Sequence, residues 1–283
     1  MPFRIAAAVV ALLVAQSDRI PIRMVPVPNQ TFHMRSSMDM DMDTTFDSST
    51  PLPSGVPGSM KLRMTTIVSQ TMTVGAKDDL GQITADAVID DVQSSVSMNG
   101  APMPAPNPMT ALANKKFSVV FAPTGEIVDV SSTMPGAPQD LMKSLLSSFG
   151  QSMPVGTIGV GETIAVPLSF NLPLQMGTPG NLDGQSHMTL VSVTNGPSGR
   201  IAHFTMTMNG RMTMSGPMTA AQPGLTMTME MNGTGTMDTN LDRGMIEAAE
   251  GHHDIVMSTS GVRGDTPVQM QMKGTLTTRQ TVQ

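Results

Sequence analysis

The sequence contains no cysteine, no tryptophan and no tyrosine. The missing cysteine excludes disulfides, thiol catalysis, cysteine-based zinc sites and a lipid-modified N-terminal cysteine. Charged residues make up only 13% of the 283 residues, which is well below the share in a typical soluble domain. The net charge of −6 comes without any basic run, so a nucleic-acid partner is not expected.

Methionine supplies much of the apolar content that is present. The chain has 30 Met against 8 Phe, and its hydrophobic share of 39% is below that of a typical globular chain. Glycine, proline, serine and threonine fill much of the remainder. This composition suits an exported β-protein better than a cytosolic enzyme.

The N-terminus has the three parts of a secretory signal peptide. A short basic start, MPFR, precedes the apolar run IAAAVVALLVA at 5–15, and small residues follow at Ala15 and Ser17. The apolar run is too short to cross a bilayer, and no later segment is expected to cross one. We therefore expect 1–17 to be a signal peptide and 18–283 to form a single β-rich domain, exported to the periplasm or the extracellular space. A buried N-terminal strand is the alternative.

A strict two-residue alternation occurs in TFHMRSSMDMDMDT, residues 31–44. Even positions carry methionines and odd positions carry a histidine, an arginine and three aspartates. Successive side chains of a strand point to opposite faces, so such a strand has one dry face and one wet face. This is the signature of an antiparallel sheet with one face buried.

The same alternation recurs along most of the chain. The runs are long for strands, so they require curvature or bulges, which we expect at glycines within the runs and at Asp90–Asp91, where the apolar face changes parity. The fold class is therefore mainly β: a long curved antiparallel sheet, forming a half-barrel or an open barrel. Strands are expected near 31–44, 60–74, 82–98, 117–122, 126–131, 163–174, 184–195, 200–214, 225–238, 244–258 and 267–282.

One segment has a different period. In PQDLMKSLLSSFG, residues 138–150, Leu141, Leu145 and Phe149 recur at helical spacing. Pro138 suits the first turn of a helix, and the final glycine suits its end. The segment predicts one short helix at 138–149 that joins two halves of the sheet.

Two stretches carry a resemblance to a known group. FSVVFAPTGEIVDVSS at 117–132 forms a strand, a Pro-Thr-Gly turn and a strand, and MPVGTIGVGETIAVPLSF at 153–170 begins the second half of the sheet. Together with the signal peptide and the curved sheet, they resemble the half-barrel of the outer-membrane lipoprotein carriers and a group of exported bacterial proteins of similar shape. The resemblance implies an envelope β-protein with a concave apolar face, and it implies no catalytic residues.

The methionines of the dry faces are the candidate binding residues. Flexible methionine surfaces suit varied apolar partners, so we predict that a lipid or another apolar small molecule binds where the sheet curls around them. The predicted contacts are Met206, Met208, Met227, Met229, Met270 and Met272.

Two other interpretations remain open. Soft thioethers select soft ions, so Met-x-Met strands could bind Cu(I) or Ag(I), with Met38, Met40 and Met42 as the candidate ligands. An apolar stripe at strand period is ordinarily core, which favours packing over metal binding. The third interpretation is a structural or interaction module of the envelope with no small ligand.

No sequence pattern predicts catalysis. The chain has no Gly-x-Ser-x-Gly elbow and no Walker loop, and its paired carboxylates fall in turn or bulge contexts. The pair His252–His253 lies beside Asp254 but has no spaced third ligand for zinc, so an exposed, solvated pair is expected. We therefore expect a non-enzyme without a cofactor; the sequence leaves protein partners open.

Overall fold

The computed structural model describes residues 19–22, 25–46, 59–103, 113–132, 156–173, 179–216, 225–263 and 266–282. The expected signal peptide, 1–17, lies outside these ranges. The described residues contain no helix, so the expectation of one short helix is not borne out there, and the segment 138–149 on which it falls lies outside them. Among the described residues no helix is long and apolar enough to cross a membrane.

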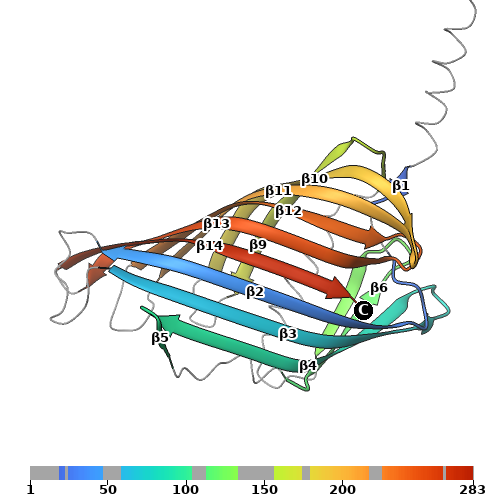
Figure 1. Ribbon diagram of the computed structural model, residues 1–283, viewed down its shortest axis with the longest axis horizontal. Coiled ribbons are helices and arrows are strands. Elements are labelled where there is room, and N and C mark those ends of the chain that lie inside the picture. The colour runs from blue at the N-terminus through green and yellow to red at the C-terminus, as the bar shows by residue number, and fades with distance from the viewer. Residues whose placement is uncertain are drawn as a thin grey trace, which may run out of the picture.

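Most of the described residues belong to one 12-stranded antiparallel sheet that is not closed (Figure 1). The strands agree with the ranges expected from the alternation, to within a few residues at each end. In chain order they are β2 (Thr31–Phe46), β3 (Ser59–Lys77), β4 (Ile83–Met98), β5 (Ala101–Pro102), β6 (Lys116–Phe121), β7 (Ile127–Ser132), β9 (Thr163–Pro173), β10 (Pro179–Gly196), β11 (Gly199–Gly216), β12 (Leu225–Asn240), β13 (Met245–Arg263) and β14 (Thr266–Val282).

The sheet consists of two meanders that meet at one seam. Strands β2 to β7 form one meander, with the short β5 paired to β4, and β9 to β14 form the other. The meanders join where β14 pairs antiparallel with β2, from Phe46 opposite Met270 to Met34 opposite Val282. The outer strands of the sheet are β7 and β9.

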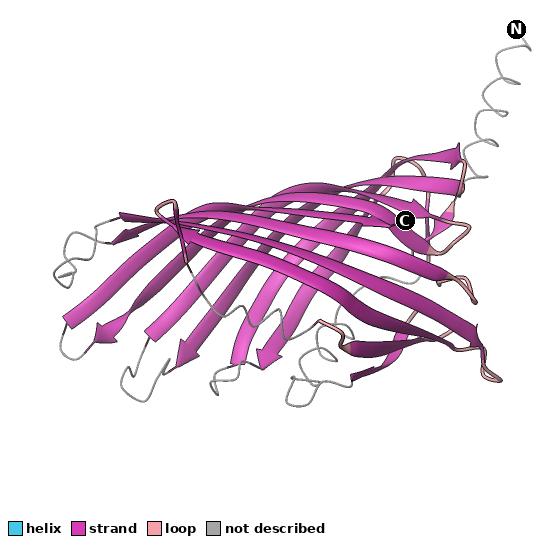
Figure 2. Cartoon of the chain, turned by 60° about the horizontal axis from the view of Figure 1, so that its bottom comes forward, coloured by secondary structure: helices cyan, strands magenta, loops and turns pink. Residues whose placement is uncertain are grey.

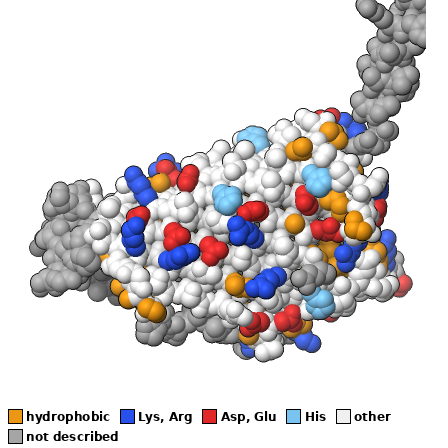
Figure 3. Space-filling model, in the orientation of Figure 1, with side chains coloured by type: hydrophobic (Ala, Val, Ile, Leu, Met, Phe, Trp, Pro, Cys, Tyr) orange, Lys and Arg blue, Asp and Glu red, His pale blue; other side chains and the backbone are white. Residues whose placement is uncertain are grey.

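The two faces of the sheet differ as the alternation predicts. Met40 lies opposite Leu276 and Met64, which places the three on one face. Figure 2 shows the sheet arching over a concave side, and Figure 3 shows charged side chains scattered over the convex side. Cross-strand ion pairs of the convex side join Lys61 to Asp43, Arg63 to Asp41, Arg211 to Glu230 and Arg279 to Glu250.

Glycines on the concave side allow neighbouring strands to approach closely. A Cβ at Gly274 would collide with the backbone of β2, and a Cβ at Gly235 would lie 2.6 Å from the carbonyl oxygen of Glu250. The register does not shift at these glycines, so they mark close approach of the strands rather than bulges. The bulge expected near Asp90–Asp91 is confirmed, because β4 skips one residue where it faces Ser69 and Gln70.

One end of the concave face is covered by a second, two-stranded sheet, in which β1 (Ile20–Pro21) pairs with β8 (Thr157–Ile158). The side chain of Ile158 is fully buried there. Arg19 donates hydrogen bonds of 2.6 and 2.8 Å to the carboxylate of Glu162, and this lowers the pKa of the Glu162 carboxyl. We call this part of the face the closed end; its packed residues are Ile20, Ile22, Ile158, Met188, Leu190, Ala202 and Phe204.

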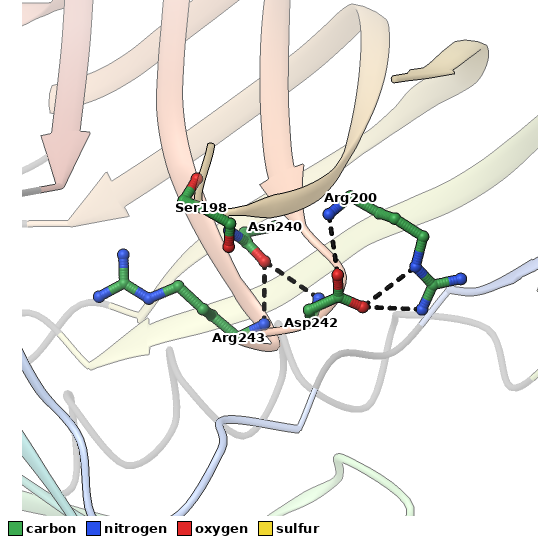
Figure 4. Close-up of polar contacts among 5 residues, drawn as sticks. All are labelled: Ser198, Arg200, Asn240, Asp242 and Arg243. Carbon is green, nitrogen blue, oxygen red and sulfur yellow. Dashed lines mark hydrogen bonds and ion pairs between the residues drawn. The ribbon is translucent and has the colours of Figure 1, made fainter. Parts of the chain in front are cut away.

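A buried asparagine organises the turn between β12 and β13 beside the closed end (Figure 4). Asn240 is 0% exposed, and its Oδ1 accepts hydrogen bonds from the backbone amides of Asp242 and Arg243 at 3.0 and 2.9 Å. Its Nδ2 donates to the carbonyl oxygen of Ser198 at 2.9 Å and to the carboxylate of Glu247 at 2.7 Å. The Asn240 side chain therefore forms hydrogen bonds with groups from three segments of the chain.

An arginine–aspartate pair extends this cluster to β11. Arg200 donates from Nε and Nη2 to the Asp242 carboxylate at 3.0 and 2.8 Å, and its backbone amide donates to the same carboxylate at 2.9 Å. These bonds lower the pKa of the Asp242 carboxyl and raise the pKa of Arg200. On the other side of the turn, the guanidinium of Arg243 lies 4.7 Å from the centre of the Phe32 ring.

Candidate functional site

A row of residues crosses the middle of the concave face, one from each of eight neighbouring strands. Each member lies directly opposite the next in the register, and every one is partly exposed. We call this row the methionine trough; from β10 to β4 it consists of Ser186, Met208, Gly233, His253, Leu276, Met40, Met64 and Val96.

The trough differs from the closed end along the same strands. On β10, Leu190 is 0% exposed and Met188 is 4% exposed, whereas Ser186 is partly exposed. On β11, Phe204 is 3% exposed, whereas Met208 is partly exposed. The cover that β1 and β8 give to the closed end therefore does not extend to the trough.

The structure places all six predicted contact methionines on the concave face. Met208 belongs to the trough, and Met206 lies two residues away on the same strand. Met229 and Met272 lie on either side of Met257, directly opposite it in the register. Met227 and Met270 likewise flank Thr259, whose buried hydroxyl has no hydrogen-bond partner. That they contact a ligand stays a prediction.

The methionines proposed as metal ligands also lie on the concave face, but they gather few further thioethers. Met38 lies between Thr278 and Thr66, and Met42 lies between Gly274 and Leu62. Met40 alone faces another methionine across the strands, Met64. Among the described residues no group of three or more His, Cys, Asp or Glu side chains is placed to hold a metal ion.

His253 is the one ionisable residue among the eight of the trough. Its imidazole lies across two glycines: a Cβ at Gly233 would collide with Nδ1, and a Cβ at Gly251 would lie 2.7 Å from Nε2. Nδ1 is buried and has no hydrogen-bond partner. Burial, and secondly the charge of His252, lowers the pKa of His253, so the ring is neutral at pH 7.

The two adjacent histidines lie on opposite faces. His252 is exposed on the convex side, where Nδ1 lies 3.2 Å from the hydroxyl of Thr277. The expectation of an exposed, solvated pair is therefore wrong for His253. The parity of the strand contained the correct signal, because position 253 alternates in phase with Ile255 and Met257.

A hydroxyl–imidazole–carboxylate chain crosses β10, β11 and β12 on the convex side. Thr194 Oγ1 lies 2.8 Å from Nε2 of His203, and Nδ1 of His203 lies 2.7 Å from Asp238 Oδ1. The order of groups matches a nucleophile, a base and an orienting acid, but acyl transfer also needs a pocket and oxyanion donors. Neither a cavity of about 400 Å³ nor one of about 610 Å³ among the described residues is lined by any of the three.

No family model matches the chain, and the search of curated proteins finds no match. Among solved structures, two substituted variants of the porin of Rh. blastica align with TM-scores of 0.30 and 0.29 and identities of 9% and 10%, over 87% of this chain and 99% of the porin. An outer-membrane channel from Pseudomonas putida F1 aligns with a TM-score of 0.19 and 8% identity, over 91% of this chain and 97% of the channel. These neighbours are β-rich like this chain, but TM-scores this low carry no argument about ligand or location. The resemblance to lipoprotein carriers stays a prediction.

Proposed function

We propose that this protein is an exported, non-catalytic binder of an apolar ligand, such as a lipid or an acyl chain, and that the ligand lies in the methionine trough. One observation carries the proposal. A single concave face is sealed by β1 and β8 at the closed end, with Leu190 and Phe204 at 0% and 3% exposure, yet it stays partly exposed along the whole trough. An apolar surface that stays partly exposed among the described residues is stabilised when a ligand covers it, by roughly 25 cal/mol per Å².

The dimensions of the trough suit a chain-like ligand. Its eight residues lie on eight adjacent strands, which are about 4.8 Å apart, so the row spans about 34 Å. That length accommodates an extended acyl chain. The thioether side chains of Met40, Met64 and Met208 are unbranched and can adjust to ligands of different shape.

The side chains of the convex face favour contact with water rather than with lipid. Its strands carry exposed ion pairs, such as Arg63 with Asp41 and Arg279 with Glu250. Strands that face lipid carry apolar residues on the side that the lipid contacts, and here that pattern is reversed. The exposed charges therefore favour an apolar ligand taken into the concave side over a membrane around the convex side.

A fluorescent fatty-acid probe tests the proposal with a pair of neighbouring substitutions. Met208→Gln places a polar amide in the trough, whereas Thr207→Gln places the same amide on the convex face one residue away. We expect the parent and Thr207→Gln to bind the probe alike and Met208→Gln to bind it more weakly, with all three melting cooperatively. Absence of binding in the parent, or equal weakening in both variants, would contradict the proposal.

The remaining candidate is an interaction module without a small ligand. Native mass spectrometry of protein purified from its source distinguishes it from the proposed binder. A co-purifying lipid mass supports the binder. A bare polypeptide mass, together with no binding of the fatty-acid probe, supports the module instead.

A further inference from the structure

The buried Nδ1 of His253 is a polar atom without a partner on an apolar face. Leaving such a group unsatisfied is unfavourable, because it gives up its hydrogen bonds to water and gains none in return. A bridging water would need two to four polar partners, but the residues beside and opposite His253 on this face are Gly233, Gly251, Ile255 and Leu276. These four neighbours therefore offer the nitrogen no polar side chain.

The space on the β12 side of the imidazole is flanked by two thioethers. Gly233 contributes no side chain there, and Met208 lies directly opposite it on β11. Met231 precedes Gly233 by two residues on β12, so it projects from the same face. His253 and Met208 lie two strands apart, about 10 Å, and their side chains can meet over the glycine.

We propose that a soft monovalent metal ion, Cu(I) or Ag(I), binds over Gly233, held by Nδ1 of His253 and the thioether sulfurs of Met208 and Met231. Thioethers select soft ions, and imidazole is a suitable ligand for copper. The site requires the tautomer with its proton on Nε2, which leaves the lone pair of Nδ1 free.

The glycines explain why the site forms at this position. At Gly233 any side chain would occupy the place of Nδ1, and at Gly251 it would approach Nε2. The Met38, Met40 and Met42 strip has a glycine beside it, Gly274 opposite Met42, but no histidine faces it: Met40 lies between Leu276 and Met64, and Met38 between Thr278 and Thr66. Metal binding over Gly233 and metal binding at the Met38, Met40 and Met42 strip therefore predict different effects of leucine substitution.

Anaerobic Cu(I) titration against a chromophoric competitor tests the site. The variants are His253→Phe, the double variant Met208→Leu/Met231→Leu, and the control triple variant Met38→Leu/Met40→Leu/Met42→Leu. We expect the parent and the triple variant to bind one ion. We expect the other two variants to bind at least about tenfold more weakly, since removing even a residue that only orients a ligand typically costs 10- to 100-fold.

Ag(I) titration of protein labelled at its methionine methyl groups gives a second readout that does not depend on the competitor. The methyl resonances of Met208 and Met231 should shift at one equivalent, while those of Met38 and Met42 should not. Both leucine variants conserve volume. The single variant Met231→Leu, whose residue lies outside the trough, should weaken Cu(I) binding and bind the fatty-acid probe like the parent. This separates failure of the metal site from failure of the proposed function.

Three results would overturn the site. They are a parent that binds no Cu(I), ion binding that survives unchanged in His253→Phe and in the double variant, and ion binding that is lost only in the triple control. If His253→Phe fails to fold, as a melting curve would show, the double variant and the methyl shifts still decide the question.

Discussion

The closed end and the methionine trough belong to one concave face, but they differ in side-chain type and in exposure. At the closed end the residues are mostly branched or aromatic, such as Ile158, Leu190 and Phe204, and a second small sheet covers them. In the trough the strands carry Met208, Met40 and glycine, which are partly exposed. Branched side chains have few rotamers and suit a fixed partner, whereas methionine adapts to irregular space. The face therefore has a rigid part that holds the fold and an adaptable part, where we propose that the ligand binds.

Among the substitutions, truncation of one residue in each region should give the largest difference in the free energy of unfolding. Phe204→Ala empties a site that is 3% exposed, and such substitutions cost about 3–5 kcal/mol. Met208→Ala, four residues further along β11, removes a partly exposed side chain and should cost less than about 2 kcal/mol, the lower end for buried methionine. Denaturant unfolding measures both, and equal losses would show that the trough is as well packed as the closed end.

The next-largest loss of stability is expected from replacing Asn240, the asparagine beside the closed end. Asn240→Ala leaves two part-buried hydrogen bonds to backbone amides unmade and the Ser198 carbonyl without its partner, which costs about 1–3 kcal/mol. The exposed Asn209→Ala on β11 is the matched control and should change stability by less than about 0.5 kcal/mol. A neutral Asn240→Ala would mean that the turn holds without its side-chain bonds.

The pH dependence of stability distinguishes His253 from an exposed histidine. Its folded pKa is lowered from 6.5, so the unfolded chain binds this proton at higher pH than the folded protein does. Stability therefore falls as the pH drops below about 6.5, and the loss levels off below the folded pKa. His253→Phe should flatten the curve in this window. A parent and a His253→Phe variant with parallel curves would contradict the buried, neutral ring.

The smallest loss of stability is expected when an ion pair of the convex face is removed. Arg63 and Asp41 form an ion pair at 3.6 Å with side chains 66% and 60% exposed, so Arg63→Gln should cost less than about 1 kcal/mol. The residual effect should disappear in high salt, because the pair is screened. A larger loss that persists in salt would show that this face also contributes packing energy.

Much of the fold could be predicted because the strand period is a local property. Methionines and aspartates that alternate in one segment assign each side chain to a face, and the change of parity at Asp90–Asp91 locates a bulge before any partner strand is known. The ends of the strands could be read to within a few residues for the same reason.

The arrangement of the site could not be predicted, because register joins residues far apart in the sequence. Parity alone places His253 on the dry face, but only the pairing of β12 with β13 places Gly233 beneath its ring. The cover of the closed end likewise depends on Ile20 meeting Ile158. The alternation of Met38, Met40 and Met42 suggests a cluster, yet strand neighbours decide which thioethers gather.

The seam between β2 and β14 sets the order in which the molecule can assemble. Within each meander, strands pair with their neighbours in the chain, so those hairpins can form early and locally. The seam joins Phe46 to Met270, and pairing across so long a stretch of chain has a high entropic cost that slows folding. Until β14 is in place, β2 and β13 each present a bare edge to other chains, which is a hazard for aggregation. A substitution in β14 should therefore lower the yield of folded protein more than an equal loss of stability elsewhere.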